Sequence, residues 1–248
     1  MPGNVLPARR LASALVPDRI PEFNAYRDTY REAVEQSIAF ARTELDFFTR
    51  AKTRALLELA AQRVGDPHRL SFLDFGCGPG ETDGFLEGEV GRLAGVDIAD
   101  ELVGVARERN PWADYQAVTA GEPLPHPTGT FDVCFAVCVL HHIAPPQRPE
   151  LLREMARVTR PGGMLAIFEH NPWNPLTRRA VAGCEFDRDA VLLTRREARG
   201  LLRGAAIDEV EGSYIVFFTR ESGLLRGIER RLGWLPLGAQ YVVSGRRS

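Results

Sequence analysis

The sequence has no long apolar run and little excess of charge. The longest unbroken apolar stretch, Val133 to Leu140, is far shorter than the roughly 18 residues of a membrane-spanning helix. Near the start, only Leu11 to Val16 resembles the core of a secretion signal, and it is too short for one. The 31 Lys and Arg residues nearly balance the 33 Asp and Glu residues, so no overall field favours nucleic acid or an anionic membrane. We expect a cytoplasmic monomer or homodimer with no nucleic-acid partner and no membrane insertion.

Cysteine is scarce, and its spacing excludes two further classes of protein. The four cysteines are Cys77, Cys134, Cys138 and Cys184. None forms the Cys-x-x-Cys spacing of a zinc site, and without a secretion signal no disulfide framework is expected. We interpret them as ordinary buried thiols.

Residues that are present divide the chain into three parts. Residues 1–22 are rich in proline and arginine and predict a mobile arm. Residues 23–68 carry apolar side chains at three- and four-residue steps, which predicts a helical cap. Residues 69–248 are interpreted as the main α/β domain, with an insertion on the substrate side at about 170–194 that forms a loop or short helix.

Strands and helices alternate through the third part. The expected strands are LSFLDF, LAGVD, DYQAV, FDVCFAVC and GMLAIFE, followed by β-rich stretches at 214–219 and 239–244. Helices are expected after the glycine run, at 100–109, at 148–159, at 195–203 and around 224–232. Such alternation predicts right-handed crossovers and helices on both faces of the sheet. The fold class is therefore α/β, with a doubly wound, mostly parallel, seven-stranded Rossmann-like sheet.

The strongest chemical signal is the segment DFGCGPG, residues 74–80, directly after the first strand. Its glycines allow a sharp turn and close approach to a ligand, at the strand end where such folds bind ligands. A nicotinamide or flavin fingerprint would need a third glycine where Glu81 stands, and no Gly-Lys-Ser/Thr phosphate loop is present. Carboxylates at Asp74 and Glu81 flank the turn and favour a cationic ligand over a pyrophosphate.

Asp97 closes the second strand, 21 residues after Gly76. A carboxylate at this place can accept hydrogen bonds from both hydroxyls of a ribose, although it could also cap the helix that follows. Together with the glycine run, it indicates an adenosyl ligand without pyrophosphate.

Five motifs in order, DFGCGPG, GVDIAD, LPHPTGTFDVCF, VLHHI and RPGGMLAIFE, resemble those of class I methyltransferases that use S-adenosylmethionine (SAM). The resemblance is to the small-molecule, ubiquinone-biosynthesis-like branch (methyltransferase type 11), and it covers about Leu70 to Glu169 and the last strand. It implies a methyltransferase that moves the methyl group of SAM to an O, N or C atom of a small biosynthetic acceptor and leaves S-adenosylhomocysteine.

The same resemblance implies which residues bind the cofactor. They are Asp74, Gly76, Cys77, Gly78, Gly80, Asp97, Ile98, Gly121, Glu122 and Cys138. The first strand's end would hold the methionine part, Asp97 the ribose and Ile98 the adenine, with the backbone near Cys138 under the methionine amine. Ala120 stands where the family has an acid for the adenine amino group. Gly121 could offer its backbone N–H to the adenine ring, and Glu122 could replace the missing acid.

Histidines near the strand ends are the catalytic candidates. His141 and His142 follow the fourth strand and His170 ends the fifth. Imidazole titrates near neutrality, and it could act as a base if the acceptor must lose a proton; packing is the alternative reading of the pair. Since no carboxylate lies at the usual helical spacing from these histidines, no metal is expected. The expected substrate-pocket residues are Tyr26, Tyr30, Phe48, Asn171 and Trp173.

Other functions remain open at this point. The protein could bind SAM without transferring its methyl group, as a cyclase-like biosynthetic enzyme. It could also be a non-catalytic SAM-binding module. A nicotinamide dehydrogenase is disfavoured by Glu81.

Overall fold

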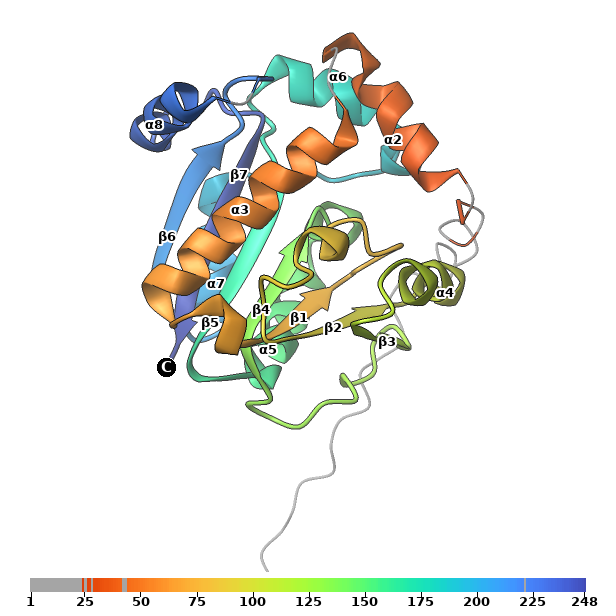
Figure 1. Ribbon diagram of the computed structural model, residues 1–248, viewed down its shortest axis with the longest axis vertical. Coiled ribbons are helices and arrows are strands. Elements are labelled where there is room, and N and C mark those ends of the chain that lie inside the picture. The colour runs from red at the N-terminus through yellow and green to blue at the C-terminus, as the bar shows by residue number, and fades with distance from the viewer. Residues whose placement is uncertain (1–23, 25, 28, 42–43, 221) are drawn as a thin grey trace, which may run out of the picture.

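The computed structural model describes residues 24, 26–27, 29–41, 44–220 and 222–248, so the arm expected at 1–22 lies outside the described residues. The strands are β1 (Ser71–Phe75), β2 (Arg92–Asp97), β3 (Asp114–Ala117), β4 (Phe131–Val137), β5 (Thr159–His170), β6 (Ile207–Ile215) and β7 (Gln240–Arg247). They form one seven-stranded sheet in the order β3-β2-β1-β4-β5-β7-β6 (Figure 1). β1 to β5 pair in parallel, and β7 is antiparallel to both neighbours. The predicted fold class is confirmed.

Helices cover both faces of this sheet. They are α2 (Tyr30–Ile38), α3 (Leu45–Arg63), α4 (Asp100–Arg109), α5 (Arg148–Val158), α6 (Pro175–Gly183), α7 (Arg195–Gly204) and α8 (Gly223–Leu232). Because side chains alternate along a strand, Leu73 packs with Leu152 of α5 and Leu202 of α7 on one face, whereas Phe72 packs with Leu56 of α3 on the other. Full burial of each such side chain contributes about 1.5–3 kcal/mol.

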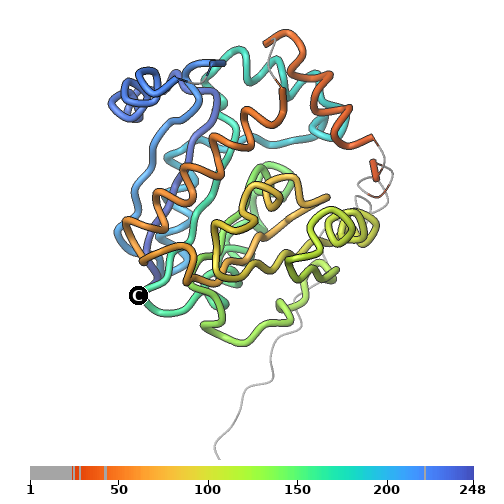
Figure 2. Tube along the Cα trace, viewed as in Figure 1, coloured from red at the N-terminus to blue at the C-terminus, as the bar shows by residue number. Residues whose placement is uncertain are grey.

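The region expected to be a helical cap divides into two. α3 crosses one face of the sheet as a layer of the α/β domain (Figures 1 and 2). Only α2 lies beyond the sheet, where it packs against α6. The segment 170–194 holds α6 and the short 3-10 helix η5 (Glu185–Asp187). None of the helices in the described ranges combines the length and apolar character needed to cross a bilayer.

The structure differs from the sequence prediction after the glycine run. A helix was expected there, but the chain forms only the 3-10 turn η3 (Asp83–Phe85). The link to β2 is short and contains Gly84 and Gly88, and the backbone of Gly88 is left-handed, with φ +73°. Glycine is among the poorest helix formers, so this link stays a series of turns.

Two strand boundaries also differ from the prediction. β5 begins at Thr159 instead of Gly163, because a register shift opposite β4 and the left-handed Gly162 (φ +76°) accommodate the Pro-Gly-Gly sequence within the strand. β6 covers Ile207–Ile215 instead of 214–219. It is an edge strand with exposed charged residues, so its sequence lacks the apolar run that marks the inner strands.

Candidate active site

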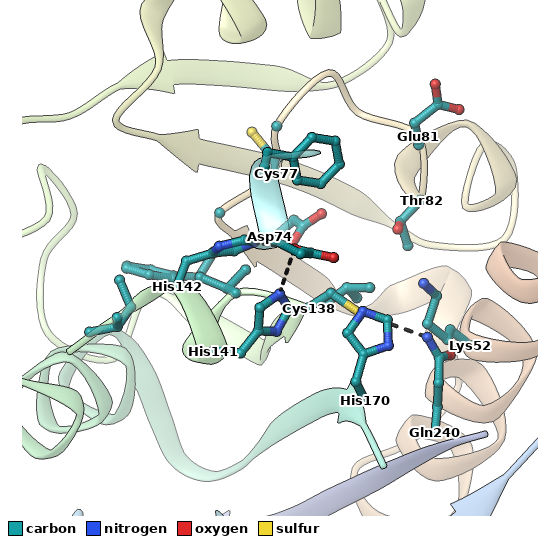
Figure 3. A pocket seen from close by; sticks show the side chains of 18 of the residues that line it. Lys52, Asp74, Cys77, Glu81, Thr82, Cys138, His141, His142, His170 and Gln240 are labelled. Carbon is teal, nitrogen blue, oxygen red and sulfur yellow. Dashed lines mark hydrogen bonds and ion pairs between the residues drawn. The ribbon is translucent and has the colours of Figure 1, made fainter. Parts of the chain in front are cut away.

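A large pocket lies where the carboxyl ends of β1, β2 and β4 meet the insertion and helices α2 and α3, and its volume is about 980 Å³. Ligand pockets in proteins usually measure about 300–1,000 Å³. The predicted residues that line it are Tyr30, Phe48, Asp74, Gly76, Cys77, Gly78, Asp97, Ile98, Gly121, Glu122, Cys138, His141, His142 and His170. Figure 3 shows several of these side chains directed toward a common space.

Four predicted residues lie elsewhere. Gly80 packs against the side chain of Asn110. Asn171 is fully buried and donates to the carbonyl oxygens of Pro236 and Gly238, so it stabilises a loop. Trp173 is 67% exposed, on the outside of the molecule. Tyr26 contacts the ring edge of Phe186 and stands behind the pocket wall.

The glycine loop is tied to the neighbouring strand. The N–H groups of Gly76 and Cys77 both donate to the carbonyl oxygen of Val96, at 2.8 and 3.1 Å. A Cβ on Gly76, whose φ is +76°, would lie 2.5 Å from Cγ2 of Val139, so this position requires glycine. In the described part of the chain, no hydrogen bond reaches the carbonyl oxygens of Gly76 and Gly78. The carbonyl oxygens of Gly76 and Gly78 are therefore available to accept hydrogen bonds from a cationic amine, whereas the N–H groups of Gly76 and Cys77 are already used.

Asp97 is fixed by the backbone on both of its carboxylate oxygens. Oδ2 accepts from the N–H of Gly78 at 2.8 Å, and Oδ1 accepts from the N–H of Ala99 at 2.9 Å. Burial raises the pKa of Asp97, and these backbone hydrogen bonds oppose the rise. α4 begins after Ala99 without a side-chain cap, so Asp97 is not its cap. Each carboxylate oxygen keeps lone pairs for a ligand hydroxyl.

Asp74 lies at the base of the pocket beside a second buried acid, Asp83. Burial, reinforced by the neighbouring Asp83, raises the pKa of Asp74 well above its usual range. Burial raises the pKa of Asp83 to about 6, although Tyr115 donates to its Oδ2 at 2.7 Å. Within the described residues, Oδ1 of Asp74 has no hydrogen-bond partner, so this acid retains an acceptor for a ligand.

Glu81 does not offer the free negative charge that was expected on this side of the loop. Its carboxylate lies 3.1 Å from Nη1 of Arg31 and 2.6 Å from Nη1 of Arg109. Two guanidinium groups therefore balance it. The acid-flanked turn is acidic on one side only, at Asp74.

Lys52 was missing from the predicted site. It extends from α3 into the pocket beside His170 and Gln240 (Figure 3), and it is only 7% exposed. It is also the only lysine in the chain, the other 30 cationic side chains being arginines. Among the described residues no carboxylate lies within ion-pair distance of it. A nearly buried, unpaired ammonium group favours an anionic ligand group, and the single lysine was the sequence signal for it.

Cys138 occupies the turn where β4 ends. Its backbone is left-handed, with φ +58°, and its N–H donates to the carbonyl oxygen of Phe168 at 2.8 Å. Nε2 of Gln240 lies 3.8 Å from its Sγ. A non-glycine residue in this conformation is strained, and such strain tends to occur at functional sites.

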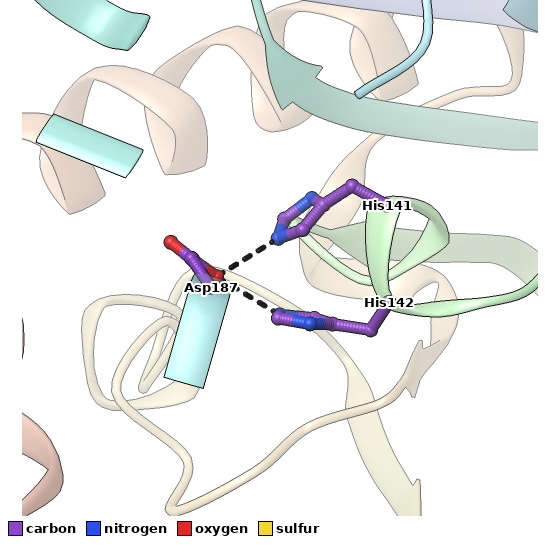
Figure 4. Close-up of side chains that lie close together, drawn as sticks. All are labelled: His141, His142 and Asp187. Atoms are coloured by element: carbon purple, nitrogen blue, oxygen red, sulfur yellow. Dashed lines mark hydrogen bonds and ion pairs between the residues drawn. The ribbon is translucent and has the colours of Figure 1, made fainter. Parts of the chain in front are cut away.

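The three histidines belong to one cluster, completed by two carboxylates. Nδ1 of His141 lies 2.6 Å from Glu169, and its Nε2 lies 3.3 Å from Oδ1 of Asp187. Nε2 of His142 approaches the same Oδ1 at 3.2 Å (Figure 4). The ring of His170 is centred 5.2 Å from that of His141. Asp187 belongs to η5, far along the chain, and no sequence spacing pointed to it.

The pKa values of His141 and His170 differ because their electrostatic surroundings differ. Burial alone would lower the pKa of His141, but the charges of Glu169 and Asp187 outweigh it and raise that pKa to about 10. Burial, together with the neighbouring charge on His141, lowers the pKa of His170 to about 4. At neutral pH in the ligand-free protein, His141 is protonated and cannot accept a proton, whereas His170 is neutral.

The sequence of this chain is similar to those of known methyltransferases. Residues 73–167 match a family described as a methyltransferase domain. The chain is 32% identical over 187 residues to the 27-O-demethylrifamycin SV methyltransferase of Amycolatopsis mediterranei, covering 73% of this chain and 61% of the relative. It is 31% identical over 136 residues to a ubiquinone biosynthesis O-methyltransferase of Xanthomonas oryzae, covering 53% of each. The chain thus spans less than two thirds of these relatives.

Solved structures agree on the fold. A SAM-dependent methyltransferase from Thermotoga maritima superposes with a TM-score of 0.60 at 18% identity, covering 88% of this chain and all of the other. Phosphoethanolamine N-methyltransferase 2 of Haemonchus contortus, in complex with SAM, gives a TM-score of 0.60 at 17% identity, covering 91% of this chain and 60% of the other. Residues 73–167 therefore match a methyltransferase-domain family, and the fold of the chain is similar to that of solved SAM-dependent methyltransferases.

Proposed function

We propose that this protein transfers the methyl group of SAM to a small-molecule acceptor. The observation that carries the proposal is that one continuous pocket joins two different sets of residues. The glycine loop and Asp97 suit a nucleoside with a cationic amino-acid tail, and the histidine cluster and the aromatic wall suit a second molecule. The pocket volume, at the upper end of the usual range, allows both to bind together.

Each part of SAM has candidate partners on this chain. Asp97 would accept from the two ribose hydroxyls. Ile98 and the backbone near Gly121 would contact the adenine, with Glu122 at the exposed rim. Asp74 and the carbonyl oxygens of the loop would accept from the methionine ammonium, and Lys52 would bind the carboxylate. The donor set fits the cofactor, because cationic and anionic ends each meet an opposite charge or a spare acceptor.

The chemistry asks for alignment more than for acid–base catalysis. When bound, SAM supplies a methyl group already activated on a sulfonium. The chain's contribution is to hold the acceptor in line with the methyl carbon and to exclude water. Tyr30 stacks on Phe186, with ring centroids 5.0 Å apart and planes within 8°, and this pair forms a rigid apolar wall for that purpose.

Among O, N and C acceptor atoms, we favour a hydroxyl oxygen on a mostly apolar molecule. Two relatives are named for O-methylation, of demethylrifamycin and in ubiquinone biosynthesis. The wall formed by Tyr30, Phe186 and Phe48 supports an apolar acceptor surface. Of His141 and His170, only His170 is neutral near pH 7, so its ring could receive a hydroxyl proton, directly or through water.

Calorimetry with SAM and S-adenosylhomocysteine tests the cofactor site. We expect one site per chain. Asp97→Ala should weaken binding of both compounds by roughly 10–100-fold, because hydrogen bonds to a charged acceptor contribute about 1.5–3 kcal/mol. Asp114 is an exposed carboxylate on β3 that pairs with Arg92 of β2. Asp114→Ala is therefore the matched control, and it should bind both compounds normally.

Two results would contradict the proposal. One is a folded wild-type protein that binds neither compound. The other is tight binding without transfer of isotope-labelled methyl to any of a panel of apolar hydroxylated compounds that the protein demonstrably binds.

A further inference from the structure

His141, His142 and Asp187 place three ligand-type atoms around one point. The atoms available to a metal on these residues all lie within 4.8 Å of one another. Figure 4 shows both imidazole rings directed at the Asp187 carboxylate from the turn after β4, while Asp187 comes from η5 on the opposite side. The three side chains line the pocket.

Two of the three separations between these atoms match an edge of a metal coordination shell, and the third is at most 4.8 Å. Ligand atoms about 2.1 Å from an ion lie about 3.0 Å apart in octahedral geometry and about 3.4 Å apart in tetrahedral geometry. The separations from Oδ1 of Asp187 to the two Nε2 atoms are 3.3 and 3.2 Å. An ion could therefore lie between Oδ1 of Asp187 and each Nε2 atom, in place of the protons that they now share.

A buried carboxylate supports one of the histidines from behind. Oε2 of Glu169 lies 2.6 Å from Nδ1 of His141, and its Oε1 accepts from the N–H of Leu140 at 2.7 Å. Metal-binding histidines almost always donate their second ring nitrogen to such a partner, which fixes the ring and leaves the other nitrogen for the ion. Glu169 is fully buried, so water does not compete for these contacts.

We propose that His141, His142 and Asp187 form a binding site for a divalent transition-metal ion, with Glu169 as the positioning residue of His141. Two imidazoles and one carboxylate suit zinc, iron, cobalt, nickel or manganese better than magnesium or calcium. Three protein ligands leave coordination positions open toward the pocket. On the function proposed above, those positions take oxygen atoms of the acceptor, such as neighbouring hydroxyl and carbonyl groups, and so orient the hydroxyl that receives the methyl group.

Metal binding can be measured without activity. Chelator-treated protein is titrated with Zn²⁺ by calorimetry and with Co²⁺ by visible absorption, and we expect one equivalent per chain. Asp187→Asn and His142→Gln should each weaken binding at least 10-fold, and Glu169→Gln by roughly 10–100-fold, the range found for partners of metal-bound histidines. His68→Gln, an exposed histidine before β1, is the control and should leave binding unchanged.

S-adenosylhomocysteine binding, measured on the same chelator-treated proteins, reports folding and separates the two proposals. Failure of a folded, cofactor-binding protein to take up stoichiometric Zn²⁺ or Co²⁺ overturns the metal site and leaves the methyltransferase proposal standing. Metal binding that survives both Asp187→Asn and His142→Gln also overturns it. Loss of cofactor binding in the wild type would count against the methyltransferase proposal alone.

Discussion

At the scale of single residues, Lys52 is the clearest candidate for recognising one chemical group of the proposed cofactor. A nearly buried ammonium group without an ion pair needs a counter-charge to offset its desolvation, and the carboxylate of the methionine tail is the anionic group that the proposed cofactor brings. Asp74, Cys138 and His170 line the same pocket as Lys52.

We predict that Lys52→Met weakens SAM binding by roughly 10–100-fold, because a hydrogen bond to a charged group contributes about 1.5–3 kcal/mol. The same change should leave the affinity for 5′-methylthioadenosine unaltered, since that nucleoside has no carboxylate. Calorimetry with both compounds measures the difference, and Lys52→Arg should recover part of the loss. An equal loss for both compounds would show that Lys52 acts on the pocket's shape and not on the carboxylate.

At the scale of elements, the turn η3 brings a buried acid into the molecule at a cost in stability. The pKa of Asp83 rises to about 6 in the fold from about 3.9 in an unfolded chain. A raised pKa means that the folded state holds the proton more tightly. The contribution of Asp83 to the stability of the fold is therefore fully present below about pH 4, where the carboxyl is protonated in both states. That contribution is lost as the pH rises through 6, because the buried carboxyl must then ionise.

Asp83→Asn should consequently raise the free energy of unfolding at pH 7.5 by about 1–3 kcal/mol and flatten its dependence on pH between 4 and 6. The amide oxygen can still accept from Tyr115. Urea denaturation at pH 4.5 and 7.5 measures this, with Asp114→Asn as an exposed control. A variant that is less stable at pH 7.5, with the wild-type pH profile intact, would refute the argument.

The short helix η5 shows how much one inserted element contributes. It supplies Asp187 to the histidine cluster and Phe186 to the aromatic wall. Neither residue follows from periodicity, because η5 is three residues long and belongs to a stretch with little pattern. Its place above the strand ends depends on packing of α6 against α2, which only the folded chain reveals.

At the scale of the whole molecule, the architecture follows largely from the sequence. Buried parallel strands require apolar runs such as those around Leu73 and Phe135, and the glycine loop and Asp97 lie at predictable ends of the first two strands. For this reason, the motifs alone located the half of the pocket that we propose binds the cofactor. The register of β6, exposed at an edge, could not.

The part of the pocket that we propose binds the methyl acceptor was predicted less well, for a different physical reason. Asn171 and Trp173 follow β5 closely, yet a hydrogen-bonded loop directs them away from the pocket. Glu81 stands beside the glycine run, yet Arg31 from α2 neutralises it across a distance of 50 residues. Contacts between segments remote in sequence decide which neighbours of a motif become available to a ligand, and a linear pattern does not contain them.

The single lysine also has a practical meaning for labelling. Apart from the α-amino group, an amine-directed reagent has one side chain to modify in this protein, and that side chain lies inside the pocket. Acylation of Lys52 becomes a readout of occupancy, slow when the cavity is filled and faster when it is vacant. For the same reason, coupling the protein to a surface through lysine would obstruct its own ligand, so attachment should use another chemistry.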